Sequence, residues 1–279
     1  MSFISQVLID QTSAGTSLTT KSEVSAFQQK IRQLLNGYDT FLQGSYANDT
    51  AISDINDVDI VALEVPVGLG SINATTLFND IKSRIETDYN YIGNTIINKK
   101  CLSINLSTKK ADIVPAIKGI LAVNKNYYGE PIFIADGIAN YPKTHINNGI
   151  SKNKRTNDNY KKIVRMLKHF VNNHNIKNIA LSFYLECLIY SYHNCFFTND
   201  LPLSLSIILR RLNSSLFNPN FRTVAGDKYV ISQTEWHPQV FAQFKNLVSC
   251  LLPHLIASLT AKNEQTANYY YRRFFNINI

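Results

Sequence analysis

The pattern of apolar and polar residues divides the chain into two halves. In the first half, short apolar or alternating runs predict strands at 38–43, 57–65, 101–107 and 109–117, while apolar residues at helical spacing predict helices over 24–35 and 76–89. In the second half the helical spacing dominates, and it predicts helices over 158–172, 178–196, 202–213, 236–259 and 264–275. We therefore predict a mixed α/β part followed by a helical part.

Turn and cap signals mark the ends of these elements. Thr20 to Glu23 fits a capping box, and Asn36-Gly37 is typical of a helix C-terminus. Gly44-Ser45 predicts a turn, Pro115 is expected to close the strand in which it lies, and Pro253 is expected to kink or split its helix. We interpret the polar, basic segment 140–158 as a turn-rich connection between the halves.

Composition favours an ordered protein and makes anionic partners plausible. Hydrophobic residues make up 45% of the 279 residues and charged residues 17%, which suits a packed core. A net charge of +8 makes polyanions plausible partners, although charge alone does not decide this. The six histidines form no HExxH motif, which argues against a zinc site.

The cysteines and the absence of long apolar runs predict a cytoplasmic protein without a membrane partner. Cys101, Cys187, Cys195 and Cys250 show no CxxC spacing, so we expect reduced, mostly buried thiols. No window approaches eighteen uninterrupted apolar residues, and the N-terminus lacks the basic and apolar regions of a signal peptide.

Two carboxylates interrupt a strand that is apolar on both faces. Asp57 and Asp59 are two residues apart and therefore project from the same face of the strand 57–65, which we expect to be central and covered by helices. Asp112 lies in the apolar strand 109–117. If the two strands are neighbours, three carboxylates converge at a cost that divalent cations such as Mg²⁺ relieve. Alternatively, these residues are strand-edge acids paired with Lys109 and Lys110.

The Gly44-Ser45 pair is informative because it lies shortly before Asp57 and Asp59 in the sequence. Glycine lets the backbone approach a ligand closely, and a serine hydroxyl with successive backbone N–H groups can hold phosphates. Such a pair on its own has little specificity, since most are ordinary turns.

The order of a GS turn, a DxD strand and a third strand Asp resembles the polymerase-β-like nucleotidyltransferase superfamily. Within it, "GSYANDTAISDINDVDIVALEV", "ADIVPAI", "NYPKTHINNGISKNKRTNDNYKKIVRMLKHF" and "IALSFYLECLIYSY" resemble the bacterial cGAS/DncV-like nucleotidyltransferases (CD-NTases). The likeness covers roughly residues 20–196, and the remainder agrees only as a helical lobe. It implies an α+β fold: a polymerase-β-like lobe with a mixed sheet and flanking helices at 1–150, a helical lobe at 151–279, and the active site in a cleft between them.

The resemblance also implies roles for the carboxylates and the GS turn. Asp57 and Asp59 would bind two Mg²⁺ ions (Mn²⁺ is an alternative), and Asp112 would bind the catalytic metal and activate the acceptor hydroxyl. Ser45, with the backbone of Gly44, would hold the donor triphosphate.

Two further phosphate contacts are implied by the resemblance, namely Lys168 in "RMLKHF" and Ser182 in "ALSFYLE". From periodicity alone, Lys168 lies outside the apolar stripe of its helix and equally fits a solvated basic face, and Ser182 equally fits a helix N-cap. Across residues 143–177, nine Lys or Arg stand against the single acid Asp158, which favours triphosphates or another polyanion.

The function implied is a cyclic oligonucleotide synthase, with a cyclic dinucleotide favoured, that joins nucleoside triphosphates and releases pyrophosphate. Its product would act on a downstream effector in anti-phage defence, and the enzyme would be a monomer; whether a nucleic acid activates it stays open. One alternative is a nucleotidyltransferase that modifies an RNA end, a small molecule or a protein. Another is an inactive nucleotide sensor or nucleic-acid-binding module.

Overall fold

The protein is seen in a computed structural model that describes residues 2–52, 57–64, 74–98, 100–106, 110–118, 129–134 and 139–278. It divides into two compact units. One comprises residues 16–146, and the other combines residues 1–15 with 147–279. The predicted boundary at residue 150 separates a catalytic lobe from a helical lobe, and this division by function stays a prediction.

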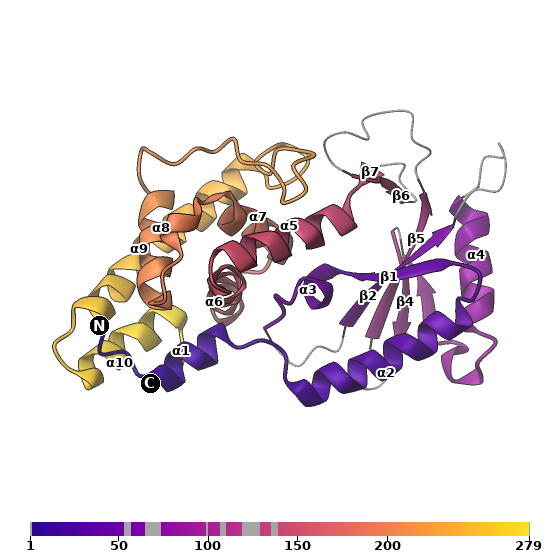
Figure 1. The fold of residues 1–279 in the computed structure, drawn as a ribbon, viewed down its shortest axis with the longest axis horizontal. Helices are drawn as coiled ribbons and strands as arrows, with labels where there is room; N and C mark the ends of the chain where they lie inside the picture. The colour runs from indigo at the N-terminus through magenta and orange to yellow at the C-terminus, as the bar shows by residue number, and fades with distance from the viewer. Residues whose placement is uncertain are drawn as a thin grey trace. The chain divides into compact units, whose positions relative to one another are not determined.

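The unit 16–146 is built on a seven-stranded mixed sheet (Figure 1). Its path is β1-β2-β5-β4-β3, and β6 and β7 extend from the second half of β5. Only β2 and β5 are parallel, which confirms the predicted mixed sheet. The elements are α2 Leu18–Leu34, β1 Asp39–Gln43, α3 Gly44–Ala47, β2 Asp57–Glu64, α4 Ala74–Ile85, a 3₁₀ turn at Tyr89–Tyr91, β3 Thr95–Ile97, β4 Leu102–Asn105, β5 Lys110–Lys118, β6 Ile132–Ile134 and β7 Ala139–Asn140.

Helices α2 and α4 pack against one face of this sheet. Period-two alternation directs Val58, Ile60 and Ala62 of β2 and Ala111 and Ile113 of β5 into the core beneath these helices. The opposite face carries a smaller apolar cluster made of strand residues, including Val61 and Leu63. Asp59 and Asp112 belong by parity to this second face, so the helix-covered core is free of their charge.

Three local predictions were wrong in detail. Ser17, and not Thr20, is the N-cap of α2, because its side chain accepts a hydrogen bond from the Thr20 N–H. Gly44-Ser45 begins the four-residue helix α3 instead of a simple turn. Pro115 does not end β5: β4 pairs with β5 only as far as Ile113 and β6 begins at Ala116, so the missing N–H of proline falls between two partner strands.

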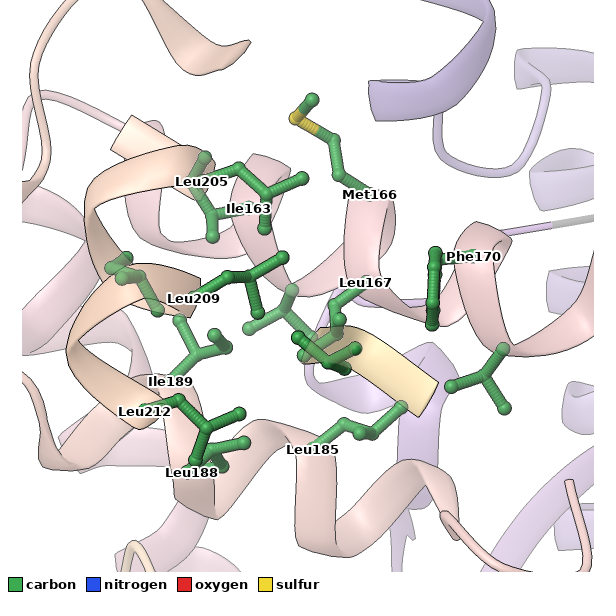
Figure 2. Close-up of a cluster of buried hydrophobic side chains, with 14 of the residues drawn as sticks. Ile163, Met166, Leu167, Phe170, Leu185, Leu188, Ile189, Leu205, Leu209 and Leu212 are labelled. Carbon is green, nitrogen blue, oxygen red and sulfur yellow. The ribbon is translucent and has the colours of Figure 1, made fainter. Parts of the chain in front are cut away.

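The helical unit packs around α6 and α7. Figure 2 shows Ile163 and Leu167 of α6 among leucines of α7 and α8. The predicted helices 158–172, 178–196, 202–213, 236–259 and 264–275 are confirmed in kind, although the second is shorter and α9 continues through Pro253 without splitting. The elements are α1 Gln6–Ser13, α6 Asn159–Asn173, α7 Ser182–Ser191, a 3₁₀ turn at Asn194–Phe196, α8 Leu201–Leu212, α9 Pro238–Thr260 and α10 Glu264–Phe275.

The segment 140–158 was predicted as a turn-rich connection but contains helix α5, Pro142–Arg155. Proline at its first position has the helical φ and needs no N–H partner, and three basic residues in the last turn suit the negative end of the helix dipole. Polar composition concealed these signals. The boundary between the two units falls within α5.

Helix α9 bears on the prediction that the protein has no membrane-spanning segment. Within the part of the chain that the structure describes, it alone is long and apolar enough to cross a membrane by length and composition. It also packs with α8 and α10 and places Phe244, Val248 and Leu255 in the core. One such helix is weak support for a membrane protein, because core helices pass the same test.

Candidate active site

The parallel pairing of β2 with β5 brings the predicted carboxylates together. The register sets Asp59 opposite Asp112 and Asp57 opposite Lys110. Because Cα partners in a parallel pair carry their side chains on the same face, Asp59 and Asp112 stand side by side. Asp57 begins β2, but its side chain lies outside the described part of the structure. The neighbouring strands that the sequence hypothesis required are therefore present.

A polar network orients Asp112. Ser103, its register partner on β4, donates a hydrogen bond of 2.5 Å from its hydroxyl to Asp112 Oδ1. Asn98 in turn donates from Nδ2 to the Ser103 hydroxyl at 2.6 Å. The Lys110 ammonium lies 3.4 Å from Asp112 Oδ2, so the ion pair of the simpler alternative is present as well. The Asp112 side chain keeps 24% of its surface exposed, which leaves it open to a ligand.

Gly44 lies directly against the Asp59 carboxylate. Strand β1 ends at Gln43, the register partner of Asp59, and α3 begins at the next residue. Gly44 has φ +72°, and a Cβ at this position would meet Asp59 Oδ2 at 2.0 Å. Only glycine fits both the left-handed backbone and the contact. The GS motif therefore packs directly against the DxD strand.

Ser45 follows within α3, where its carbonyl accepts a hydrogen bond from the Thr50 N–H at 2.9 Å. This hydrogen bond closes the short segment that follows the helix. Among the described side chains no group of three His, Cys, Asp or Glu forms a metal cluster; Asp59 and Asp112 supply two of the three predicted carboxylates.

Lys168 is buried in an ion pair, contrary to the solvated basic face that periodicity suggests. Its ammonium lies 2.6 Å from Glu186 Oε1 on α7, and the two side chains are 4% and 5% exposed. Arg165, on the same side of α6, is also buried and donates from Nε to the Ser13 carbonyl at 2.7 Å. The partners of these buried cations come from other elements, namely Glu186 on α7 and Ser13 at the end of α1. A role for Lys168 at phosphate stays a prediction.

Ser182 is the first residue of α7, and Leu181 occupies the N-cap position. The simple N-cap interpretation of Ser182 is therefore wrong. The next residue, Phe183, keeps 39% of its surface exposed.

Sequence reasoning missed the supporting residues Ser103, Asn98 and Glu186. Glu186 lies within the quoted "SFYLE" block, which could have marked it as a partner for a buried cation. Ser103 could be found only by aligning β4 with β5, because its partner Asp112 is on another strand.

Comparison with known proteins agrees with this arrangement. The C-terminal helical domain of cGAS/DncV-like nucleotidyltransferases matches residues 147–252. A cyclic UMP-AMP synthase from Rhodothermus marinus is 29% identical over 198 residues, covering 58% of this chain and 68% of that protein. A cyclic dipyrimidine nucleotide synthase from Legionella pneumophila is 30% identical over 190 residues, covering 57% and 64%. This chain thus spans about two thirds of the length of either relative.

The fold extends this likeness to nearly the whole chain. The structure of the Rhodothermus marinus CdnE c-UMP-AMP synthase with Apcpp and Upnpp superposes with a TM-score of 0.71 at 23% identity, over 90% of this chain and 97% of that chain. Residues 147–252 therefore match the C-terminal helical domain of the cGAS/DncV-like nucleotidyltransferases, and the chain is similar to bacterial proteins that are named as cyclic nucleotide synthases.

Proposed function

We propose that this chain joins two nucleoside triphosphates into a cyclic dinucleotide, with release of pyrophosphate at each of two transfers. The observation that carries the proposal is the β2–β5 register, which sets Asp59 beside Asp112 while the backbone of Gly44 lies against Asp59. Two adjacent carboxylates next to a glycine-led backbone turn suit transfer between phosphates better than hydrolysis by a Ser or Cys nucleophile.

In this proposal Asp112 activates the acceptor hydroxyl. The Ser103 hydroxyl donates a hydrogen bond to Asp112 Oδ1. The other oxygen, Oδ2, lies near Lys110 and would face the incoming ribose. A carboxylate held by a neighbouring hydroxyl presents one oxygen in a fixed direction, and such positioning supplies most of the rate enhancement in phosphoryl chemistry. The acceptor oxygen then bonds to the α-phosphorus of the donor while the bond to pyrophosphate breaks.

The donor set fits magnesium. Asp59 and Asp112 offer hard oxygen ligands on one face, and Asp57 is assigned to the same group by its place in β2. Two Mg²⁺ ions, when bound, neutralise charge on the transferred phosphate and on its leaving oxygen. Mn²⁺ prefers the same ligands.

The triphosphate contacts are assigned to the backbone of Gly44, to Ser45, Lys168 and Ser182. Gly44 and Ser45 directly follow Gln43, the register partner of Asp59, and this position supports their assignment to the triphosphate. Lys168 would keep Glu186 as one partner while its charge acts on the phosphates, since an ammonium has three N–H donors. The exposed ring of Phe183 beside Ser182 would stack on a base.

The wider role follows from the family. We infer that the product is a second messenger for anti-phage defence, that it acts through a downstream effector, and that the enzyme is a cytoplasmic monomer. The bases, the ring size and the linkage are not assigned.

The test is incubation of the purified chain with all four nucleoside triphosphates and Mg²⁺, followed by phosphatase treatment and mass spectrometry. We expect phosphatase-resistant cyclic dinucleotides from the wild type and at least a 100-fold loss for Asp59→Asn and Asp112→Asn. Asp49→Asn, at an exposed ion pair with Lys21, is the matched control and should remain active.

Other outcomes would point to the alternatives. Turnover only after addition of RNA, a small hydroxyl compound or a protein would replace the cyclase with a nucleotidyltransferase for that acceptor. Binding of nucleotide or nucleic acid without metal-dependent turnover would indicate a sensor or binding module.

A further inference from the structure

The cysteines do not follow the expectation of mostly buried thiols. Within the part of the chain that the structure describes, only Cys187 is buried; Cys101 is half-buried, and Cys195 and Cys250 are exposed. The two exposed thiols belong to the same unit but have different neighbours. Cys195 lies in the 3₁₀ turn after α7, whereas Cys250 lies on α9.

An imidazole is positioned to take the proton of the Cys195 thiol. His193 Nδ1 lies 3.1 Å from Cys195 Sγ, and the same nitrogen accepts the backbone N–H of Cys195 at 3.3 Å. In the tautomer with its hydrogen on Nε2, Nδ1 accepts from both the backbone N–H and the thiol, which share its single lone pair. The backbone N–H of the 3₁₀ turn favours this tautomer, in which the imidazole can act as a base.

A buried cation lies beside the turn that carries this sulfur. Lys152 of α5 is 5% exposed, and its ammonium donates to the Tyr192 carbonyl and faces the rings of Tyr190 and Phe197 at 5.4 and 5.1 Å. Burial lowers the pKa of Lys152 to about 8, and the proximity of Cys195 acts in the opposite direction, as expected if the thiolate stabilises the ammonium. The Arg155 guanidinium also lowers the pKa of this lysine.

A cavity lies next to the turn that carries the thiol. His193 and Phe196, which flank Cys195 in the sequence, line this cavity of about 670 Å³ together with Arg211 and Arg222, whereas Cys195 itself is not among its lining residues. The two guanidinium groups favour an anionic molecule near this turn.

We propose that Cys195 is a reactive thiol that forms mixed disulfides with small anionic disulfides, with His193 as its base and Lys152 as the cation that stabilises its thiolate. The thiol proton passes to His193 Nδ1, and the thiolate attacks one sulfur of the disulfide. The S–S bond breaks, and the leaving thiolate departs with the proton from the imidazolium. The protein sulfur is oxidised, and one half of the disulfide is reduced.

The experiment follows the reaction of the folded, full-length chain with 5,5′-dithiobis(2-nitrobenzoate), an anionic aromatic disulfide. We expect one equivalent to react at least tenfold faster than the next. Cys195→Ser should remove the fast phase and Cys250→Ser a slow one, and mass spectrometry of peptides from briefly labelled wild type should place the adduct on Cys195.

His193→Gln should slow the fast phase about tenfold while leaving the slow phase unchanged. Its matched control is His254→Gln, four residues after Cys250 on α9, which should alter neither phase. Since His193 and Cys195 are exposed, these substitutions do not disturb the core. Equal rates at Cys195 and Cys250 within threefold, or an unchanged fast phase in His193→Gln, would overturn the proposal. Lys152→Met, a test of the cation, should slow the fast phase severalfold.

Discussion

Replacing Gly44 by alanine tests whether the GS motif and the DxD strand act as one structure. At φ +72° an alanine costs about 1–2 kcal/mol for its left-handed backbone. In addition, its Cβ would lie 2.0 Å from Asp59 Oδ2 and 2.9 Å from Cγ. Because packed atoms need roughly 3 Å or more, the Asp59 carboxylate must move by about 1 Å, and a misplacement of this size can lower kcat about 10²-fold.

The chain offers a control that separates backbone strain from this collision. Gly93 has φ +76°, and a Cβ there meets nothing within 4 Å. Gly93→Ala should therefore lose about 1–2 kcal/mol of unfolding free energy and keep its activity, whereas Gly44→Ala should lose about 100-fold in kcat.

The assay pairs the rate of pyrophosphate release under saturating nucleotide and Mg²⁺ with urea unfolding of both variants. If Gly44→Ala retains a kcat within threefold of Gly93→Ala, the contact between Gly44 and Asp59 does not position the carboxylate, and this reasoning fails.

Three further predictions concern stability and positioning. Ser103→Ala should lower kcat about tenfold with little effect on the urea midpoint, because it frees Asp112 Oδ1 without opening a large cavity; an equal fall in both would indicate a structural role only. Lys168→Met should lower the free energy of unfolding, measured in urea, by about 3–5 kcal/mol, because Glu186 is then buried without this cation. The double variant Lys168→Met with Glu186→Leu should recover part of that loss. A loss below about 1 kcal/mol for the single variant would contradict a buried ion pair. The pKa of Lys152 is lowered from 10.5 to about 8 in the folded chain. Between pH 8 and 10.5 this lysine is therefore protonated in the unfolded chain but not in the folded one, so the free energy of unfolding rises with pH in that window. The unfolding free energy of wild type relative to Lys152→Met should therefore increase by about 1–3 kcal/mol from pH 7.5 to 10, and a constant difference would refute the assignment.

The sheet and its carboxylates could be predicted because their signals are local. Alternation within 57–64 and 110–118 determines which residues share a face, and this alone separates Asp59 and Asp112 from the face that carries Ile60 and Ile113. The register that joins them is not local. It depends on pairing between segments far apart in the sequence, so the hydrogen bond from Ser103 to Asp112 could not be derived.

The helical unit shows where single-helix reasoning fails. Periodicity left a solvated face open for Lys168, since it compares residues only within one helix. Its partner, Glu186, comes from another element and makes burial tolerable. Helix α5 was missed for a related reason. Much of its sequence is polar, and buried residues such as Lys152 pack against the ring of Tyr190 on α7 and that of Phe197, which follows the 3₁₀ turn.

The place of α1 in the helical unit affects how the chain folds during synthesis. The Thr12 hydroxyl lies 2.7 Å from the Tyr271 hydroxyl of α10, across 259 residues of sequence, and the backbone N–H of Ser5 donates to Asn268 across 263. A ribosome therefore makes α1 long before its partners exist, and residues 16–146 can fold while α1 waits. Such distant contacts slow folding because a long loop must close first. The core of the helical unit is complete only when α10 has emerged, so its assembly is a late step in the folding of this unit.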